Sequence, residues 1–172
     1  MGNKGMRAAM ISGMLLLGGC SAAQEKKGEA VRTERQLDEL YRPLLKLVAE
    51  SRVSVEEFMK TTLGRDWIFP LKGDEVKLWV EKAEKDLMPR NERMCALIRE
   101  KRDLVEGAEL PATFKAMLEH QDSWRELHEK YKKDQVPYSW HSRTPFPRRL
   151  EPELEETILK LEQRLAESKK AG

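Results

Sequence analysis

The chain has 172 residues, with 32 basic and 30 acidic side chains and a formal net charge of +2. Charges of both signs are interspersed along it rather than gathered in a basic block, which argues against a nucleic-acid-binding protein. The length suffices for one domain with its own core. Charged residues make up 36 % of the chain, and the abundance of Leu, Lys, Glu, Arg and Ala favours a helical domain.

The first residues have the parts of a secretory signal. Lys4 and Arg7 supply positive charge, and the apolar run 8–17 follows them. As a helix this run would be about 15 Å long, roughly half of a bilayer's ~30 Å hydrocarbon core, so it is too short for a good transmembrane span. Small residues at its end suit a peptidase site. We therefore expect residues 1–19 to be a signal peptide.

The end of this leader, Leu17-Gly18-Gly19-Cys20, resembles the lipobox of bacterial lipoproteins. The resemblance implies cleavage between Gly19 and Cys20, a diacylglycerol linked to the Cys20 sulfur, and usually an added N-acyl chain. Two or three acyl chains hold a protein on a membrane, whereas one is marginal. Ser21 stands where inner-membrane retention signals have Asp, which favours the periplasmic side of the outer membrane in a Gram-negative cell. The alternative is an ordinary signal peptide in which Cys20 is incidental.

Cleavage would change both the charge and the cysteine content of the chain. Loss of Lys4 and Arg7 leaves 30 basic and 30 acidic side chains, so the mature protein would be neutral. With Cys20 acylated, Cys95 has no partner for an intramolecular disulfide. We expect Cys95 to be a small buried apolar residue, with a reactive or intermolecular role as the alternative.

Three segments are expected after cleavage. Residues 20–33 would form the lipidated N-terminus and a flexible polar tether with a reach of roughly 20 Å. Residues 34–168 would form the helical domain, and residues 169–172 a C-terminal tail. Neither the oligomeric state nor the helix packing follows from the sequence.

Apolar residues at helical spacing predict an all-α domain, a bundle of five or six helices. The first helix, 34–50, is expected to face inward with Leu37, Leu40, Tyr41, Leu44, Leu45 and Val48. Pro43 in this helix is expected to introduce a kink or to mark the true start. Ser54 and Glu57 have the spacing of a capping box that opens a short helix ending near Gly64. The loop that follows, 64–73, is unusually apolar, and we expect a hydrophobic plug over the bundle rather than a binding surface.

The second half of the domain is predicted to contain the longest helix. Asp74 is expected to cap a helix that ends before Pro89, and another helix then continues toward Gly107. The longest helix is predicted over 111–133. An irregular segment with four prolines, 135–152, separates it from a last helix over 153–168, whose inward-facing residues are Leu154, Ile158, Leu161 and Leu165.

The proline-rich segment carries the candidate interaction surface. Aromatic anchors and arginines in a loop suit recognition of a protein partner or an anionic ligand, and an arginine can bind a carboxylate bidentately. The alternative is a proline-stiffened strap whose aromatic rings pack on the bundle. The residues of this surface are Tyr138, Trp140, His141, Arg143, Phe146, Arg148 and Arg149.

No motif predicts catalysis, a metal site or a cofactor. The sequence has no Gly-rich phosphate loop, nucleophile elbow or paired-Cys motif. His128 begins a zincin-like pattern, but Lys132 occupies the position of the second histidine and cannot bind a metal at neutral pH. His120, Trp124 and His128 share one helix face. We favour a structural role, in which His120 bonds a neighbouring loop, over a role in metal binding or pH sensing; the two histidines are roughly 12 Å apart along the axis.

These observations lead to an expected location and a less specific function. The run from Leu97 to Trp124 is similar to a helical pattern in uncharacterised bacterial proteins, and no activity follows from that resemblance. We expect a membrane-anchored envelope lipoprotein with a non-enzymatic role in protein interaction or scaffolding. The alternative is a periplasmic lipoprotein that binds a small ligand or a metal through His120, His128 or His141.

Overall fold

The computed structural model describes residues 18–134 and 144–170, and within these ranges it is an all-α bundle without strands, as predicted. Four continuous helical rods account for the bundle, slightly fewer than the five or six helices expected. The first rod consists of α1 (Gly18–Arg35), η1 (Gln36–Tyr41), α2 (Arg42–Glu57) and η2 (Phe58–Leu63); the second of α3 (Glu75–Lys82), η3 (Ala83–Leu87) and α4 (Met88–Glu100); the last two are α5 (Ala112–Asp134) and α6 (Leu150–Lys170).

The rods are longer than predicted because two prolines do not interrupt them. Pro43 lies just after the π-helical turn η1, and Pro89 just after the π-helical turn η3. A proline ring clashes with the carbonyl four residues earlier, which belongs to Glu39 or to Lys85. Both of these residues lie in the π-helical turns, whose wider hydrogen-bonding pattern accommodates the ring. The expected break before Pro89 is therefore wrong, and Pro43 lies in the first turn of α2, inside a rod that already contains α1 and η1.

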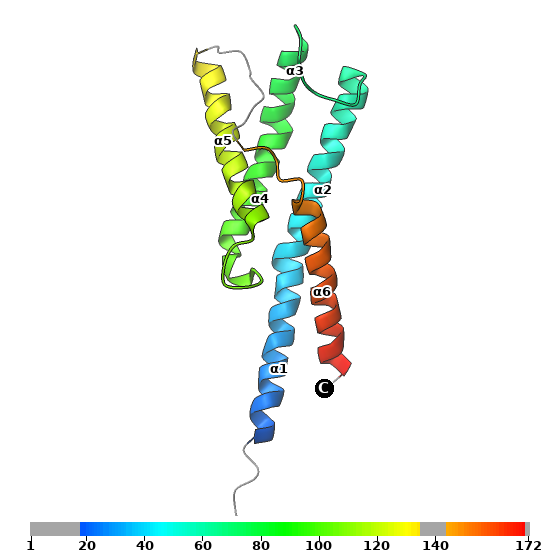
Figure 1. Ribbon diagram of the computed structural model, residues 1–172, viewed down its shortest axis with the longest axis vertical. Coiled ribbons are helices and arrows are strands. Elements are labelled where there is room, and N and C mark those ends of the chain that lie inside the picture. The colour runs from blue at the N-terminus through cyan, green and yellow to red at the C-terminus, as the bar shows by residue number, and fades with distance from the viewer. Residues whose placement is uncertain (1–17, 135–143, 171–172) are drawn as a thin grey trace, which may run out of the picture.

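The bundle is elongated, and its last two rods pack at different places along it (Figure 1). Helix α6 contacts α1, η1 and α2, whereas α5 contacts α4. Helix α1 extends past the C-terminal end of α6, and residues 24–29 are exposed. From Thr33 onward the rod is packed against its neighbours. Residues 21–33, expected to be a flexible tether, are thus helical.

Two apolar clusters form the core. The larger one joins the first rod to α4, α5 and α6, and its members on the first rod are the residues that the apolar periodicity predicted: Leu37, Leu40, Tyr41, Leu44 and Val48. The smaller one is aromatic and lies between α2, the second rod and α5. It contains Phe58, Trp79, Ala83, Leu87, Met88 and Trp124.

Two local capping predictions do not hold. Ser54 is buried inside α2, and its hydroxyl donates to the Asp86 carboxylate on η3 instead of capping a helix. Asp74 precedes α3 but makes no capping hydrogen bond. The first rod does end at Gly64, as expected, because Gly64 adopts a left-handed conformation with φ 64°.

Arg65 organises the loop between the first two rods. Its guanidinium donates to the carbonyls of Trp67, Ile68 and Pro70 at 2.8–3.1 Å and pairs with the Glu75 carboxylate at 2.9 Å. These bonds hold Ile68, Phe69 and Leu71 against the aromatic cluster. The plug prediction is confirmed for those three side chains and wrong for Trp67, which is 60 % exposed.

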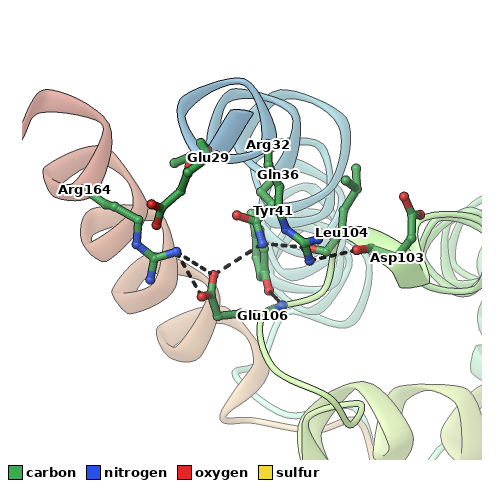
Figure 2. Close-up of polar contacts among 9 residues, drawn as sticks. Glu29, Arg32, Gln36, Tyr41, Asp103, Leu104, Glu106 and Arg164 are labelled. Atoms are coloured by element: carbon green, nitrogen blue, oxygen red, sulfur yellow. Dashed lines mark hydrogen bonds and ion pairs between the residues drawn. The ribbon is translucent and has the colours of Figure 1, made fainter. Parts of the chain in front are cut away.

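A polar network joins the first rod to the loop after α4 and to α6 (Figure 2). The buried Gln36 amide donates to the Leu104 carbonyl at 2.9 Å and to the Glu106 carboxylate at 3.3 Å. The Tyr41 hydroxyl accepts from the Glu106 backbone N–H at 2.9 Å. Arg164 of α6 pairs with the same carboxylate at 3.0 Å. These contacts hold the segment that follows α4, which contains the short 3-10 helix η4 (Arg102–Leu104), against the first rod and α6.

Candidate ligand cavity

A cavity of about 730 Å³ lies beside the aromatic cluster. Its walls come from five places in the chain: the first rod, the loop after it, the second rod, helix α5, and the segment that leads into and begins α6. Ligand cavities in proteins are typically about 300–1,000 Å³, mostly apolar, with a few polar groups that orient the ligand. The cavity has the size of such a site, and its lining has the corresponding composition.

Aromatic rings form one wall. Trp79 and Trp124 stack with their centroids 6.3 Å apart and an interplanar angle of 20°. Phe69, carried by the Arg65-bound loop, meets Trp79 edge-on at 5.4 Å. On the other side of Trp124, Phe146 meets His120 edge-on at 5.5 Å. Rings fixed in this way offer flat apolar surface at little entropic cost, which suits a planar or aromatic ligand.

His120 is a neutral polar group in this wall. It is 8 % exposed, and its Nδ1 lies 2.9 Å from the Thr144 carbonyl oxygen. Because a carbonyl only accepts, Nδ1 carries the proton, and Nε2 of the neutral ring is left as an acceptor. Burial lowers the pKa of His120 below its usual value, which favours this neutral form. The prediction that His120 bonds a neighbouring loop is confirmed.

Two further polar side chains line the cavity from deeper positions. Asn91 of α4 is 2 % exposed and Ser51 of α2 is 8 % exposed. Neither side chain makes a hydrogen bond with any residue in 18–134 or 144–170. Buried polar groups are almost always paired in folded proteins, so each such exception requires an explanation.

The charged residues of the cavity stand at its rim. Arg52 pairs with Glu151 at 3.0 Å and with Glu56 at 3.2 Å, which leaves one negative charge in excess among these three residues. Arg148 is exposed and forms no ion pair within the described part of the chain. The interior is therefore neutral, and one arginine is free at the entrance.

We expect the free energy of unfolding to fall as the pH drops from 7.5 to 5.5, in part because of His120. Its pKa is lowered by burial in the folded protein, so below pH ~6.5 the unfolded chain binds a proton that the folded chain does not. The loss from this group is at most about 1.4 kcal/mol. Carboxylates with lowered pKa values, such as Glu39 at about 2, destabilise the fold only at lower pH. Urea unfolding at pH 5.5, 6.5 and 7.5 measures the slope.

His120→Asn provides the comparison, since its amide can still donate to the Thr144 carbonyl without titrating. The variant should show a smaller pH slope than the unaltered protein. Equal slopes in the two proteins would show that His120 titrates normally. The charged residues that line the same cavity are Arg52, Glu56, Arg148 and Glu151, and they are unchanged in the variant.

The predicted interaction surface is only partly described. Tyr138, Trp140, His141 and Arg143 lie outside the described residues. Phe146 is half-buried in the cavity wall, which agrees with the alternative that the proline-rich segment packs its aromatic rings on the bundle. Arg148 lies at the rim of the cavity. Arg149 is exposed, and its Nε lies 3.7 Å from a carboxylate oxygen of Glu153. Of the lipobox, Leu17 also lies outside the described residues, while Gly18, Gly19 and Cys20 fall in the first turn of α1.

The remaining candidate side chains have structural environments. His128 is buried, and its Nε2 lies 2.9 Å from a carboxylate oxygen of Glu84, whose pKa is lowered by Lys132 and by His128. Cys95 is buried as predicted, and burial raises the pKa of its thiol to about 11. A thiol with so high a pKa is unreactive at neutral pH.

Comparisons with other proteins place the chain in no known family. No protein-family model matches it, no curated protein matches its sequence, and no solved structure matches its fold. Within 18–134 and 144–170, no three His, Cys, Asp or Glu side chains are grouped to hold a metal ion. No helix in those ranges is long and apolar enough to cross a membrane. The basis for a proposed function is therefore the chemistry of the cavity residues and of the N-terminal residues 17–20.

Sequence reasoning found part of this site. It singled out His120, Trp124, Phe146 and Arg148, and it placed Phe69 in the plug. It missed Ser51 and Asn91 as polar groups in the cavity. The sequence does contain a sign that Asn91 is buried. It lies on the apolar face of its helix, four residues after Leu87 and four before Cys95, and both of these residues are buried.

Proposed function

We propose that the chain is a lipoprotein of the bacterial envelope, anchored through Cys20, whose non-enzymatic helical domain binds a small apolar molecule. The cavity of about 730 Å³ between α2, the second rod and α5 carries the ligand-binding half of this proposal. The lipobox Leu17-Gly18-Gly19-Cys20 carries the anchoring half. Exposure of residues 24–29 supports a domain held away from the membrane surface, and the outer membrane is the favoured location.

The polar groups of the cavity favour binding over catalysis. Nucleophilic mechanisms need a hydroxyl or thiol hydrogen-bonded to a base that a third group orients. Among the described residues, His120 donates from Nδ1 to the Thr144 carbonyl, and the Ser51 hydroxyl bonds no base. The Cys95 thiol donates to the Met117 carbonyl in the other core cluster.

A neutral fluorescent probe, N-phenyl-1-naphthylamine, tests the ligand-binding half. We expect saturable binding to the purified domain, seen as an increase in probe fluorescence. Val55→Trp, which places a large ring on the cavity wall, should weaken this binding at least about tenfold, equivalent to about 1.4 kcal/mol. At a hundred times its dissociation constant the probe should add about 2.7 kcal/mol to the stability of the unaltered protein.

Val53→Trp is the matched control. Val53 lies two residues earlier on α2, is 43 % exposed and does not line this cavity. It should leave probe binding unchanged. Equal loss of binding in both variants, with melting temperatures like that of the unaltered protein, would contradict the cavity as the binding site. Absence of saturable binding to the unaltered protein would contradict the ligand-binding half.

Protein interaction is the second candidate function, and two exposed apolar side chains favour it. Trp67 is 60 % exposed at the tip of the Arg65-bound loop, and Leu78 of α3 is 43 % exposed. Aromatic residues of this kind act as anchors in protein interfaces. A photo-crosslinking residue at position 67 should then capture a defined envelope protein that the same residue at the exposed position 159 does not; identical crosslinks from both positions would oppose the idea.

A further inference from the structure

The amide of Asn91, like the indole N–H of Trp79, is a polar group of the cavity that the described part of the fold does not pair. Its side chain is 98 % buried, lines the cavity and makes no hydrogen bond with a described residue. A buried amide without a partner costs about 1–3 kcal/mol. An apolar residue would pack at this position without that cost, so the amide is better explained by a group that binds it.

A second amide lies at the same level. Along the antiparallel pair formed by the second rod and α5, Glu84 meets His128 and Cys95 meets Met117. The same register places Asn91 level with Gln121 of α5. Gln121 is 2 % exposed, and both its side-chain oxygen and its nitrogen are without hydrogen-bond partners among the described residues. Asn91 and Gln121 therefore lie at the same level of the α4–α5 pair, and neither side chain has a hydrogen-bond partner among the described residues.

The groups around Asn91 are uncharged. Ser51 contributes a hydroxyl, and His120 contributes the acceptor Nε2 of a ring that keeps its proton on Nδ1. At the rim, Arg52 pairs with Glu56 and Glu151, and with Arg148 included the formal charges there sum to zero. An ion moved into this interior would lose its hydration without gaining a counter-ion, and such a transfer costs several kcal/mol.

We propose that the cavity is a site for uncharged aromatic molecules that carry a carboxamide or a similar neutral donor and acceptor group, and that this group binds Asn91. The proposal rests on the proposed function and specifies its ligand class. The aromatic wall of Trp79, Trp124 and Phe146 takes the ring. The Asn91 amide and the Ser51 hydroxyl take the neutral group, which satisfies the otherwise unpaired Asn91.

Three probes of nearly equal shape test this assignment: 2-naphthamide, 2-naphthoate and naphthalene, titrated into the purified domain at pH 7.5 by calorimetry or fluorescence. The neutral 2-naphthamide should bind at least about tenfold more tightly than either of the others. Asn91→Leu should remove this preference over naphthalene, because it removes the hydrogen-bonding group and keeps the volume. Tighter binding of 2-naphthoate, weakened by Arg148→Gln, would overturn the neutral-ligand proposal in favour of an anion site at the rim.

The stability of the free Asn91→Leu protein is an independent readout. If Asn91 serves a ligand, the variant should melt at the same temperature as the unaltered protein or higher, because an unpaired buried amide is removed. A lower melting temperature would show that Asn91 has a structural partner in the fold, and would overturn the proposal. If Val55→Trp blocks all three probes but Asn91→Leu changes none of their affinities, the cavity binds ligands and only the assignment to Asn91 fails.

Discussion

Replacement of Cys20 with Ser is expected to move the protein from the membrane fraction of the cell to the soluble fraction. Each buried methylene of an acyl chain contributes about 0.8 kcal/mol to membrane binding, so two or three chains make retention effectively permanent. Serine provides no sulfur for the thioether, so all of these chains are lost together. Fractionation followed by immunoblotting measures the distribution, and mass spectrometry of the N-terminal peptide shows whether residues 1–19 are removed and acyl groups added.

A second substitution separates anchoring from sorting. Ser21→Asp should leave the protein acylated but retain it in the inner membrane, if the cell is Gram-negative. Unaltered protein recovered lipid-free and soluble after cleavage would instead support the ordinary signal peptide. Retention of Cys20→Ser on the membrane would show that something other than the acyl chains holds the chain there.

The helical conformation of residues 21–33 changes what an anchor at Cys20 would do. A flexible tether would let the domain approach the membrane in any orientation. Thirteen helical residues have a length of about 20 Å, similar to the reach of the coil but at a fixed distance. Because the same rod continues through η1 and α2 into the core and the cavity wall, the anchor would also orient the cavity relative to the membrane.

The sequence predicted the fold class and most of the core, because apolar periodicity is a local signal. Leu37, Leu40 and Leu44 were placed inward correctly. Predictions that relied on a single residue were less successful. Pro43 and Pro89 do not break their helices because π-helical turns absorb the steric clash, and nothing in the local sequence distinguishes that solution from a break.

The remaining differences between the predicted and the observed structure come from contacts between residues that are far apart in the sequence. Ser54 and Glu57 have the spacing of a capping box, yet Ser54 bonds Asp86, 32 residues away. The cavity has the same origin, since its walls come from five segments and no one of them has a signature of its own. His120 and Trp124 could be paired in advance because they share one helix. Asn91 and Ser51 could not be placed beside them before the rods were packed together.

Leu154→Ala is expected to cause a large loss of stability. Leu154 is 1 % exposed and belongs to the core cluster that joins α6 to the first rod. Truncating a buried leucine to alanine removes apolar contacts and leaves a cavity, at a cost of about 2–5 kcal/mol. In a domain of this size each kcal/mol lowers the melting temperature by about 2–4 °C, so the total should be about 4–20 °C.

Leu159→Ala is the control, because it makes the same chemical change on the same helix at a position that is 59 % exposed. Alanine is at least as good a helix former as leucine, so neither variant suffers a loss of helix propensity. The control should change stability by no more than about 0.5 kcal/mol. Urea unfolding of both variants measures the difference, which isolates the contribution of packing. Similar losses in the two variants would mean that α6 does not dock on the first rod through Leu154, and the network of Arg164 with Glu106 would then also be doubtful.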